Sequence, residues 1–159
     1  MTVELWRISV EAPTHAANDL SGTGTGARMT GRRWNSKGTR LVYCAANIAL
    51  ATLETVHYLN SGSMPFNRYL VRIDVPDAVW EARQVLEPLP AGWDAIPAGL
   101  TARTAGDDWI ASRATALLHV PSVIVPDECN VLINPRHRDA PTITATTLKR
   151  WIYDPRFFP

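Results

Sequence analysis

The stretch LVYCAANIALATLETVHYLN, residues 41–60, carries the clearest secondary-structure signal in the chain. Its first five residues are apolar and follow a polar, glycine-rich segment, which predicts a short buried strand over 41–45. Residues 46–60 are apolar on almost every side and are long enough for several helical turns, which predicts a helix. We therefore expect a buried strand that runs directly into an apolar helix.

Glu54 is the one formally charged residue within 41–67, and it lies in the middle of the predicted helix. At 100° per residue the Glu54 side chain shares a face with Asn47, Ala51 and Tyr58. Such a carboxylate either points to water through a narrow polar stripe or is held in a cleft. Because burial without a partner is costly, an isolated carboxylate in an apolar setting is a candidate functional group.

The segments on either side predict a mixed set of elements. Residues 21–40, SGTGTGARMTGRRWNSKGTR, hold five of the nine glycines and predict a loop with turns. The patterns predict strands over 4–10, 67–75, 121–126, 130–134 and 146–154, an irregular stretch over 76–102, and a helix over 106–120 with Asp107 or Asp108 at its N-cap. Because this order is no regular strand–helix alternation, we expect a single α+β domain over residues 1–159, with a mostly antiparallel sheet and a few helices.

The composition narrows the class of protein. Hydrophobic residues make up 46% of the 159 residues, which is enough apolar surface to fold rather than stay disordered. The 16 Lys and Arg against 15 Asp and Glu give a net charge of +1, which argues against a partner such as duplex nucleic acid. No apolar run reaches the roughly 20 residues that span a bilayer, and the N-terminus lacks the pattern of an export signal. We therefore expect a cytoplasmic protein without membrane contact.

The cysteine and histidine positions do not predict a metal site. Cys44 and Cys129 each stand alone, without CxxC spacing, and are interpreted as small buried residues. His57, His119 and His137 have no partner at HxxxH or HExxH spacing. We therefore expect no metal cofactor.

The glycine-rich segment carries a cationic motif, GRRWNSK, at residues 31–37. Guanidinium and backbone N–H groups in such a loop bind phosphate, although many arginine-rich loops are simply solvated. The segment matches neither the GxxxxGK[ST] nor the GxGxxG phosphate loop. Residues 28–40 hold five Lys and Arg and no acid, so a cationic loop precedes the isolated carboxylate of Glu54. The chain has no GxSxG motif, and Ser122 begins a predicted strand as a small residue.

The order of these pieces resembles a known family. LWRI, GRRWNSKGT, VYCA, ALATLE, GDDW and LLHVPSVIVPDECNVLINP follow one another as in the RES-domain toxins of Xre–RES toxin–antitoxin systems, over about residues 5–156. The arginine, glutamate and serine of the family name match Arg33, Glu54 and Ser122, and the family tyrosine matches Tyr43. The resemblance implies an ADP-ribosyltransferase-like fold and action on NAD by glycohydrolysis or phosphorolysis, with protein ADP-ribosylation also known. It further implies inhibition by an antitoxin with an Xre-type helix-turn-helix.

Cleavage of the nicotinamide–ribose bond passes through an oxocarbenium-like state, which needs an anion near the ribose and cations near the pyrophosphate. Glu54 is the expected anion. Arg33, with Arg7 from the first strand, is expected to hold the pyrophosphate. Arg32 competes with Arg33 for this role, and we favour Arg33 because it directly precedes Trp34 in the family-like RWN.

Two further residues complete the expected site. Tyr43 is expected to stack on the nicotinamide, or else to be a core aromatic residue. Ser122 is expected to hydrogen-bond the ribose or to orient the incoming nucleophile. Thr52 stands two residues before Glu54, where many side-chain-modifying transferases have Gln or Glu. This departure favours NAD consumption over protein modification.

Two alternatives stay open from the sequence. One is an ADP-ribosyltransferase that modifies a specific cellular protein. The other is a non-catalytic module that binds a nucleotide or a partner, in which Glu54 and Arg33 would form a structural ion pair.

Overall fold

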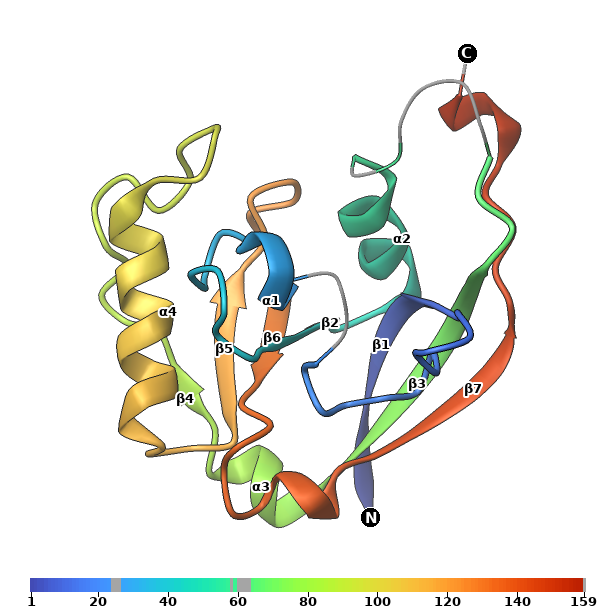
Figure 1. Cartoon of the computed structure of the whole chain (residues 1–159). Helices are drawn as coiled ribbons and strands as arrows, with labels where there is room; N and C mark the ends of the chain where they lie inside the picture. Colours follow the sequence, from blue (N-terminus) through green and yellow to red (C-terminus); the bar gives the residue numbers. More distant parts are fainter. Residues whose placement is uncertain (24–26, 58, 60–63, 159) are drawn as a thin grey trace.

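The computed structural model describes residues 1–23, 27–57, 59 and 64–158, and Figure 1 shows their arrangement. Gly24 and Gly26 of the glycine-rich segment, Tyr58 and the last residue of the helix predicted over 46–60 lie outside the described residues. The elements in chain order are β1 (Thr2–Val10), α1 (Ala27–Thr30), β2 (Val42–Ala45), α2 (Ile48–Val56), β3 (Arg68–Pro76), α3 (Asp77–Glu81), β4 (Gln84–Val85), α4 (Leu100–Ser112), β5 (Leu117–Pro121), β6 (Cys129–Ile133) and β7 (Thr144–Arg150), with short 3-10 helices at Ala140–Thr142 and Pro155–Phe157. Within the described ranges, no helix is long and apolar enough to cross a bilayer.

The described strands form one sheet in the order β4-β5-β6-β2-β1-β3-β7. Every neighbouring pair is antiparallel except β4 and β5. The α+β class with a mostly antiparallel sheet is thus confirmed.

The sheet is nearly divided in its middle. β1 pairs with β3 along its whole length, but it pairs with β2 only where Trp6 meets Ala45. Beyond that pair the two strands diverge, which leaves one half made of β4, β5, β6 and β2 and another made of β1, β3 and β7. Figure 1 shows the two halves side by side, with α2 between their upper ends.

One helix covers each half of the sheet. Trp109 and Ile110 of α4 pack on Leu118, Val120 and Leu132 of the first half. Burial of such side chains contributes about 1.5–3 kcal/mol each. These contacts fix α4 against β5 and β6.

The helix α2 packs on the other half. Its Leu50 and Ala51 contact a cluster that contains Ile8, Leu70 and Tyr153. The opposite face of the sheet buries a third cluster, whose members include Leu5, Val42, Cys44, Val71, Ile73, Val75, Leu117, Val131 and Ile133. Because the third cluster draws side chains from both halves, it holds them together behind the gap between β1 and β2.

The helix predicted over 106–120 is wrong in both bounds. The helix α4 begins at Leu100, inside the stretch predicted to be irregular, and ends before Arg113, whose left-handed backbone (φ 51°) stops it. The segment Leu117–Pro121 is instead the strand β5, because its buried leucines pair with β6. Asp107 caps no helix; its carboxylate accepts the N–H of Ser36 at 2.9 Å.

Other predicted bounds also change. The strand predicted over 121–126 is mostly a loop, because the Ser122 hydroxyl accepts the N–H groups of Ile124 and Val125 and closes a turn. The predicted loop over 21–40 contains the short helix α1, and the irregular stretch over 76–102 contains α3 and β4. The helix predicted over 46–60 is described over Ile48–Val56, and the closing strand predicted over 146–154 is β7, which begins and ends earlier.

Gly106 allows α4 to lie directly on the cationic loop. It is buried in the middle of the helix, and a Cβ atom at this position would overlap the carbonyl oxygen of Trp34. The close approach is maintained by Asp107, one residue further, through its bond to Ser36. Glycine is therefore required at position 106 for α4 to lie against the backbone of Trp34.

We predict that Gly106→Ala destabilises the protein, although alanine is the better helix former. The new methyl group must push the Trp34 backbone away, and such overpacking typically costs about 1–3 kcal/mol. Urea unfolding measures the free energy of unfolding. Thr104→Ala, at an exposed position of the same helix, is the control and should not destabilise; an unchanged or raised stability of Gly106→Ala would contradict the close approach.

Candidate active site

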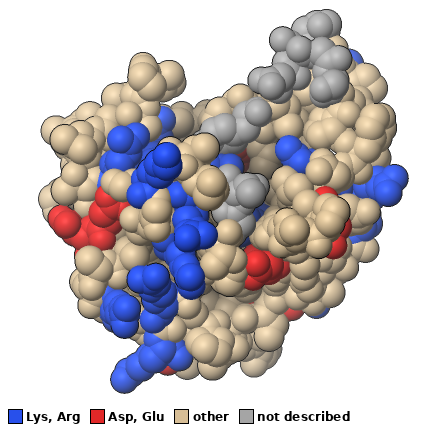
Figure 2. All heavy atoms as spheres, viewed as in Figure 1, with Lys and Arg blue, Asp and Glu red and all other residues tan. Residues whose placement is uncertain are grey.

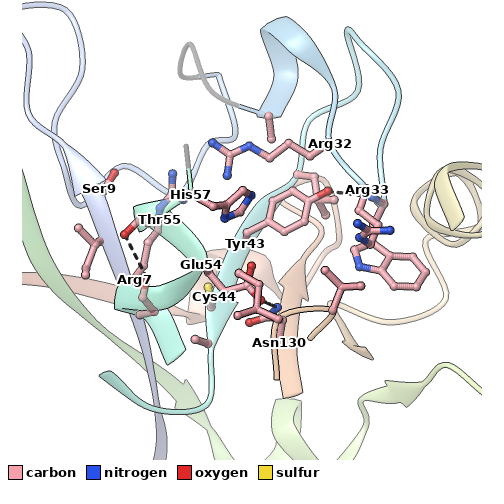
Figure 3. Close-up of a pocket in the computed structure, with 18 of the residues that line it drawn as sticks. Arg7, Ser9, Arg32, Arg33, Tyr43, Cys44, Glu54, Thr55, His57 and Asn130 are labelled. Carbon is pink, nitrogen blue, oxygen red and sulfur yellow. Dashed lines mark hydrogen bonds between the residues drawn. The ribbon is translucent and has the colours of Figure 1, made fainter. Parts of the chain in front are cut away.

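A cavity of about 750 Å³ opens where the two halves of the sheet diverge. It is lined by β1 and β2, by α2, by the cationic loop around α1, by residues 96–98 before α4 and by the β5–β6 loop. Its size is that of a pocket for a small molecule or cofactor. Figure 3 shows that side chains from both halves of the sheet point into it.

Glu54 reaches this cavity from α2, and one of its oxygens is held by two donors. Its Oε1 accepts the hydroxyl of Ser122 at 2.6 Å and the amide of Asn130 at 2.7 Å. The other oxygen, Oε2, has no hydrogen-bond partner among the described residues. Of the two possibilities raised by the sequence, the carboxylate is therefore held in a cleft, with one oxygen fixed and one left for a ligand.

Ser122 lies behind Glu54 and does not line the cavity. It is completely buried (0% exposed). Its Oγ accepts the N–H groups of Ile124 and Val125, each at 3.1 Å. A hydroxyl has a single proton, so these two bonds direct that proton to Glu54. Ser122 thereby orients the carboxylate through the β5–β6 loop.

Tyr43 ties the cationic loop to β2. Its hydroxyl donates to Oδ1 of Asn35 at 2.7 Å and accepts the N–H of Trp34 at 3.1 Å. Asn35 is fully buried and donates to three carbonyls of its own loop. The Tyr43 ring lines the cavity, and the Arg32 guanidinium lies over it, 5.7 Å from the ring centroid.

Arg33 lies on the side of the cavity nearer α4. Its guanidinium donates to the carbonyls of Trp93 and Ala95, each at 2.8 Å, and Trp34 stacks on Trp93 with 6.4 Å between ring centroids. Arg33 therefore braces the segment before α4 while it lines the cavity. No ion pair joins it to Glu54 in the described part of the chain.

Arg7 reaches the cavity from β1, on the other side of Glu54 in Figure 3. Removal from water lowers the pKa of Arg7 from its ordinary value, and the charge of Arg32 lowers it further, while Cys44 and Asp19 act in the opposite direction. No described residue forms a hydrogen bond or an ion pair with its guanidinium. A half-buried cation to which the described part of the chain supplies no partner favours binding of an anion.

Residues 4–154 match the family model of the RES domain. The chain belongs to the RES domain family. The resemblance to RES-domain toxins is thus confirmed over nearly the whole chain.

The relatives of this RES-domain chain are toxins. The "Prs ADP-ribosylating toxin" of Sphingobium sp. (strain YBL2) is 54% identical over 158 residues, which cover 98% of this chain and 97% of the relative. The protein "Toxin Res" of Pseudomonas putida is 42% identical, over 86% of this chain and 87% of the relative. "Toxin Res" of Yersinia enterocolitica is 35% identical, over 84% and 88%.

The fold also matches a solved structure. A chain in the crystal structure of the M. tuberculosis MbcT–MbcA toxin–antitoxin complex superposes with a TM-score of 0.66 at 13% identity, covering 99% of this chain and 87% of that chain. At this identity the match concerns the fold.

The RES-domain fold brings most of the predicted site residues together. Arg7, Arg33, Tyr43 and Glu54 line one cavity, and Ser122 contacts Glu54 from behind. Residues without a predicted role also line the cavity, among them Asn130, His57 and Arg103. For Asn130 the signal was a polar residue at the start of the apolar run NVLIN.

Two titratable groups that line the cavity, His57 and Cys44, have shifted pKa values that keep them uncharged at neutral pH. Burial lowers the pKa of His57, and the charges of Arg32 and Arg33 lower it further. Together these effects outweigh the opposite effect of the Glu54 carboxylate, so the His57 imidazole is neutral at pH 7. Burial raises the pKa of the Cys44 thiol to about 12, which keeps it protonated and inert. Cys44 is buried as predicted, whereas Cys129 is half-buried.

The walls of the cavity are strongly cationic. Besides Arg7, Arg32 and Arg33, its lining includes Arg28 and Arg103, and the buried Nε of Arg103 has no partner among the described residues. Figure 2 shows Lys and Arg side chains gathered in a band over the part of the face that carries α1. No group of three His, Cys, Asp or Glu side chains in the described ranges could hold a metal ion.

We predict that Arg7→Met raises the stability of the ligand-free protein. The change removes a half-buried charge that has no partner among the described residues, and single stabilising changes of this kind typically contribute about 0.5–2 kcal/mol. Thermal unfolding without ligand measures the effect. Arg72→Met is the control, because the Arg72 guanidinium lies 3.1 Å from the Asp74 carboxylate and its removal should give no gain. A loss of stability in Arg7→Met would mean that Arg7 has a structural partner.

Proposed function

We propose that this RES-domain toxin consumes NAD in the cytoplasm by cleaving the bond between nicotinamide and ribose, and so arrests growth. The observation that carries the proposal is the Glu54 carboxylate in a cavity with cationic walls: Ser122 and Asn130 fix one oxygen, and the other has no hydrogen-bond partner among the described residues. Such a site offers an anion to a positively charged ribose and cations to a pyrophosphate, which are the two charges that NAD presents during this cleavage.

The cationic side chains are proposed to bind the pyrophosphate. Arg7 has no partner among the described residues, and Arg32 lies close enough to act on its pKa, so an anion between them relieves their mutual repulsion. Arg33 uses one nitrogen to brace the segment before α4 and keeps its other N–H groups for the substrate. This arrangement supports a shared role for Arg32 and Arg33.

In the proposed reaction, the glycosidic C–N bond breaks and its electron pair moves to the nicotinamide nitrogen. Positive charge then develops on the ribose, and Glu54 stabilises it through Oε2, which also accepts a ribose hydroxyl. Tyr43 offers its ring to the nicotinamide. Ser122 and Asn130 keep the carboxylate in place, so that little reorganisation is needed when the charge forms.

The acceptor completes the reaction in one of two simple ways. Water forms a bond to the ribose carbon, releases a proton and gives ADP-ribose. Inorganic phosphate attacks the same carbon through one oxygen and gives ADP-ribose phosphate. Both products leave free nicotinamide and drain the NAD pool.

A second candidate function is transfer of ADP-ribose to a cellular protein. The 54% identical relative named "Prs ADP-ribosylating toxin" supports this possibility. Against it, the hydroxyl of Thr52, where many transferases have Gln or Glu, donates to the Ile48 carbonyl of its own helix at 2.9 Å. Its hydroxyl is thus committed to the helix rather than to an acceptor.

We predict that Glu54→Gln lowers the rate of nicotinamide release from NAD by about 10²–10³-fold, the usual effect of removing one stabilising group from a transition state. The glutamine carbonyl still accepts from Ser122 and Asn130, so the free energy of unfolding should change little. Chromatography of nicotinamide, with circular dichroism of the same sample, measures both quantities.

The control for this variant is Glu81→Gln, which removes an exposed carboxylate from α3 and should keep full activity. Labelled NAD with and without phosphate, and with bacterial lysate, shows whether ADP-ribose ends on water, phosphate or protein. Intact NAD under all three conditions would refute the enzymatic function, and label on one lysate protein would establish the transferase.

We further propose an antitoxin as the protein partner, of the Xre-type helix-turn-helix class, seated over the cavity mouth. The MbcT–MbcA toxin–antitoxin complex, which contains a chain of the same fold, supports such a partner. Arg28, Arg32 and Lys37 place positive charge beside the cavity, which suits an acidic or carboxylate-ended segment.

We predict that the double variant Arg28→Glu, Lys37→Glu binds its cognate antitoxin about ten-fold more weakly or worse, because like charges across an interface cost several kcal/mol. Isothermal titration of the purified pair measures the dissociation constant. The double variant Lys149→Glu, Arg150→Glu on β7 makes the same change of charge elsewhere and should bind normally. Equal affinity of both variants would show that the cationic loop is not part of the interface.

A further inference from the structure

Asn47 uses both ends of its side-chain amide at the start of α2. Its Oδ1 accepts the N–H of Leu50 at 2.8 Å and caps the helix. Its Nδ2 donates to Oε2 of Glu128 at 2.6 Å, in the β5–β6 loop. The residue that begins the helix therefore also bonds it to another element.

Glu128 belongs to the same turn as Ser122. The N–H of Ser122 donates to the Glu128 carbonyl at 2.9 Å, and the N–H of Glu128 donates to the Val125 carbonyl at 2.9 Å. Val125 in turn donates its own N–H to the Ser122 hydroxyl. A shift of Glu128 therefore moves the hydroxyl that holds Glu54.

The two contacts between α2 and the loop lie on one side of the helix. Asn47 and Glu54 are seven residues apart, about two turns, so their side chains leave α2 in nearly the same direction. One contact is the Asn47–Glu128 bond, and the other is the Ser122–Glu54 bond. The Asn47–Glu128 bond therefore sets the distance between α2 and the β5–β6 loop, which the Ser122–Glu54 bond must span.

We propose that Asn47 and Glu128 are positioning residues for catalysis, which set the place of the Glu54 carboxylate by fixing α2 against the β5–β6 loop. The proposal rests on the proposed function of Glu54. Neither residue lines the cavity, so neither is expected to touch the substrate. Their loss should lower kcat and leave the KM for NAD nearly unchanged, because displacement of a reacting group by about 1 Å can cost on the order of 10²-fold.

The bond can be broken and restored without loss of the helix cap. In Asn47→Asp the carboxylate still accepts from Leu50 but faces the Glu128 carboxylate without a proton to donate, and Asp caps helices as well as Asn. In Glu128→Gln the amide oxygen still accepts from Asn47. In the double variant the glutamine amide donates to the aspartate, so the bond is re-formed with its direction reversed.

We predict a ten- to hundred-fold loss of kcat for nicotinamide release in Asn47→Asp, near-normal kcat in Glu128→Gln, and recovery to within a few-fold of wild type in the double variant. The KM for NAD should stay within about two-fold throughout. Asp127→Asn removes a neighbouring exposed charge from the same loop and should leave kcat unchanged. Normal kcat in Asn47→Asp, or equal loss in the single and double variants, would overturn the proposal.

A second measurement does not depend on activity. The amides of Ile124 and Val125 donate to Ser122, so their hydrogen exchange, followed by NMR, reports the turn that holds Glu54. Exchange should accelerate in Asn47→Asp and return toward the wild-type rate in the double variant. If wild type releases no nicotinamide, the proposed function fails, while the exchange data still decide whether the bond fixes this turn. Unchanged exchange in Asn47→Asp would refute the structural coupling itself.

Discussion

The fold is organised around the contact between β1 and β2, which is limited to the pair Trp6–Ala45. A continuous ladder at this point would close the sheet and fill the space between its halves with side chains. Because the ladder stops after one pair, the strands diverge and their neighbouring residues border a cavity. The buried cluster behind the gap keeps the halves in a fixed relation, so the cavity is built on strands and a packed helix, which hold side chains more precisely than loops do.

Side chains of opposite charge line different sides of this cavity. The carboxylate of Glu54 is oriented from behind by Ser122 and Asn130, while Arg7 and Arg33 reach the cavity from its two sides. Arg7, whose guanidinium has no partner in the described ranges, costs stability in the ligand-free protein. Such a cost is typical of functional sites, where binding of the substrate supplies the missing interaction.

Local sequence patterns predicted the strands at 4–10, 67–75 and 130–134 well, because their side-chain alternation or apolar character survives in the folded sheet. They failed for α4, where the apolar run Leu117–Pro121 reads equally well as the end of a helix or as a strand. The isolated carboxylate indicated Glu54, and the family resemblance added Ser122, but neither predicted the bond between them. That bond, like the contact of Asn130 with Glu54, joins residues 68 and 76 positions apart and depends on the sheet order, which no local pattern contains.

In the proposed function, Glu54 meets the nicotinamide ribose of NAD inside the cavity between the two halves of the sheet. A crystal structure of the Glu54→Gln variant with bound NAD tests it most directly, since this variant keeps the bonds to Ser122 and Asn130. We expect a ribose hydroxyl within hydrogen-bond distance of the side chain at position 54, and the pyrophosphate between Arg7 and Arg32. A dinucleotide bound outside the cavity, or bound with its nicotinamide ribose turned away from position 54, would contradict it.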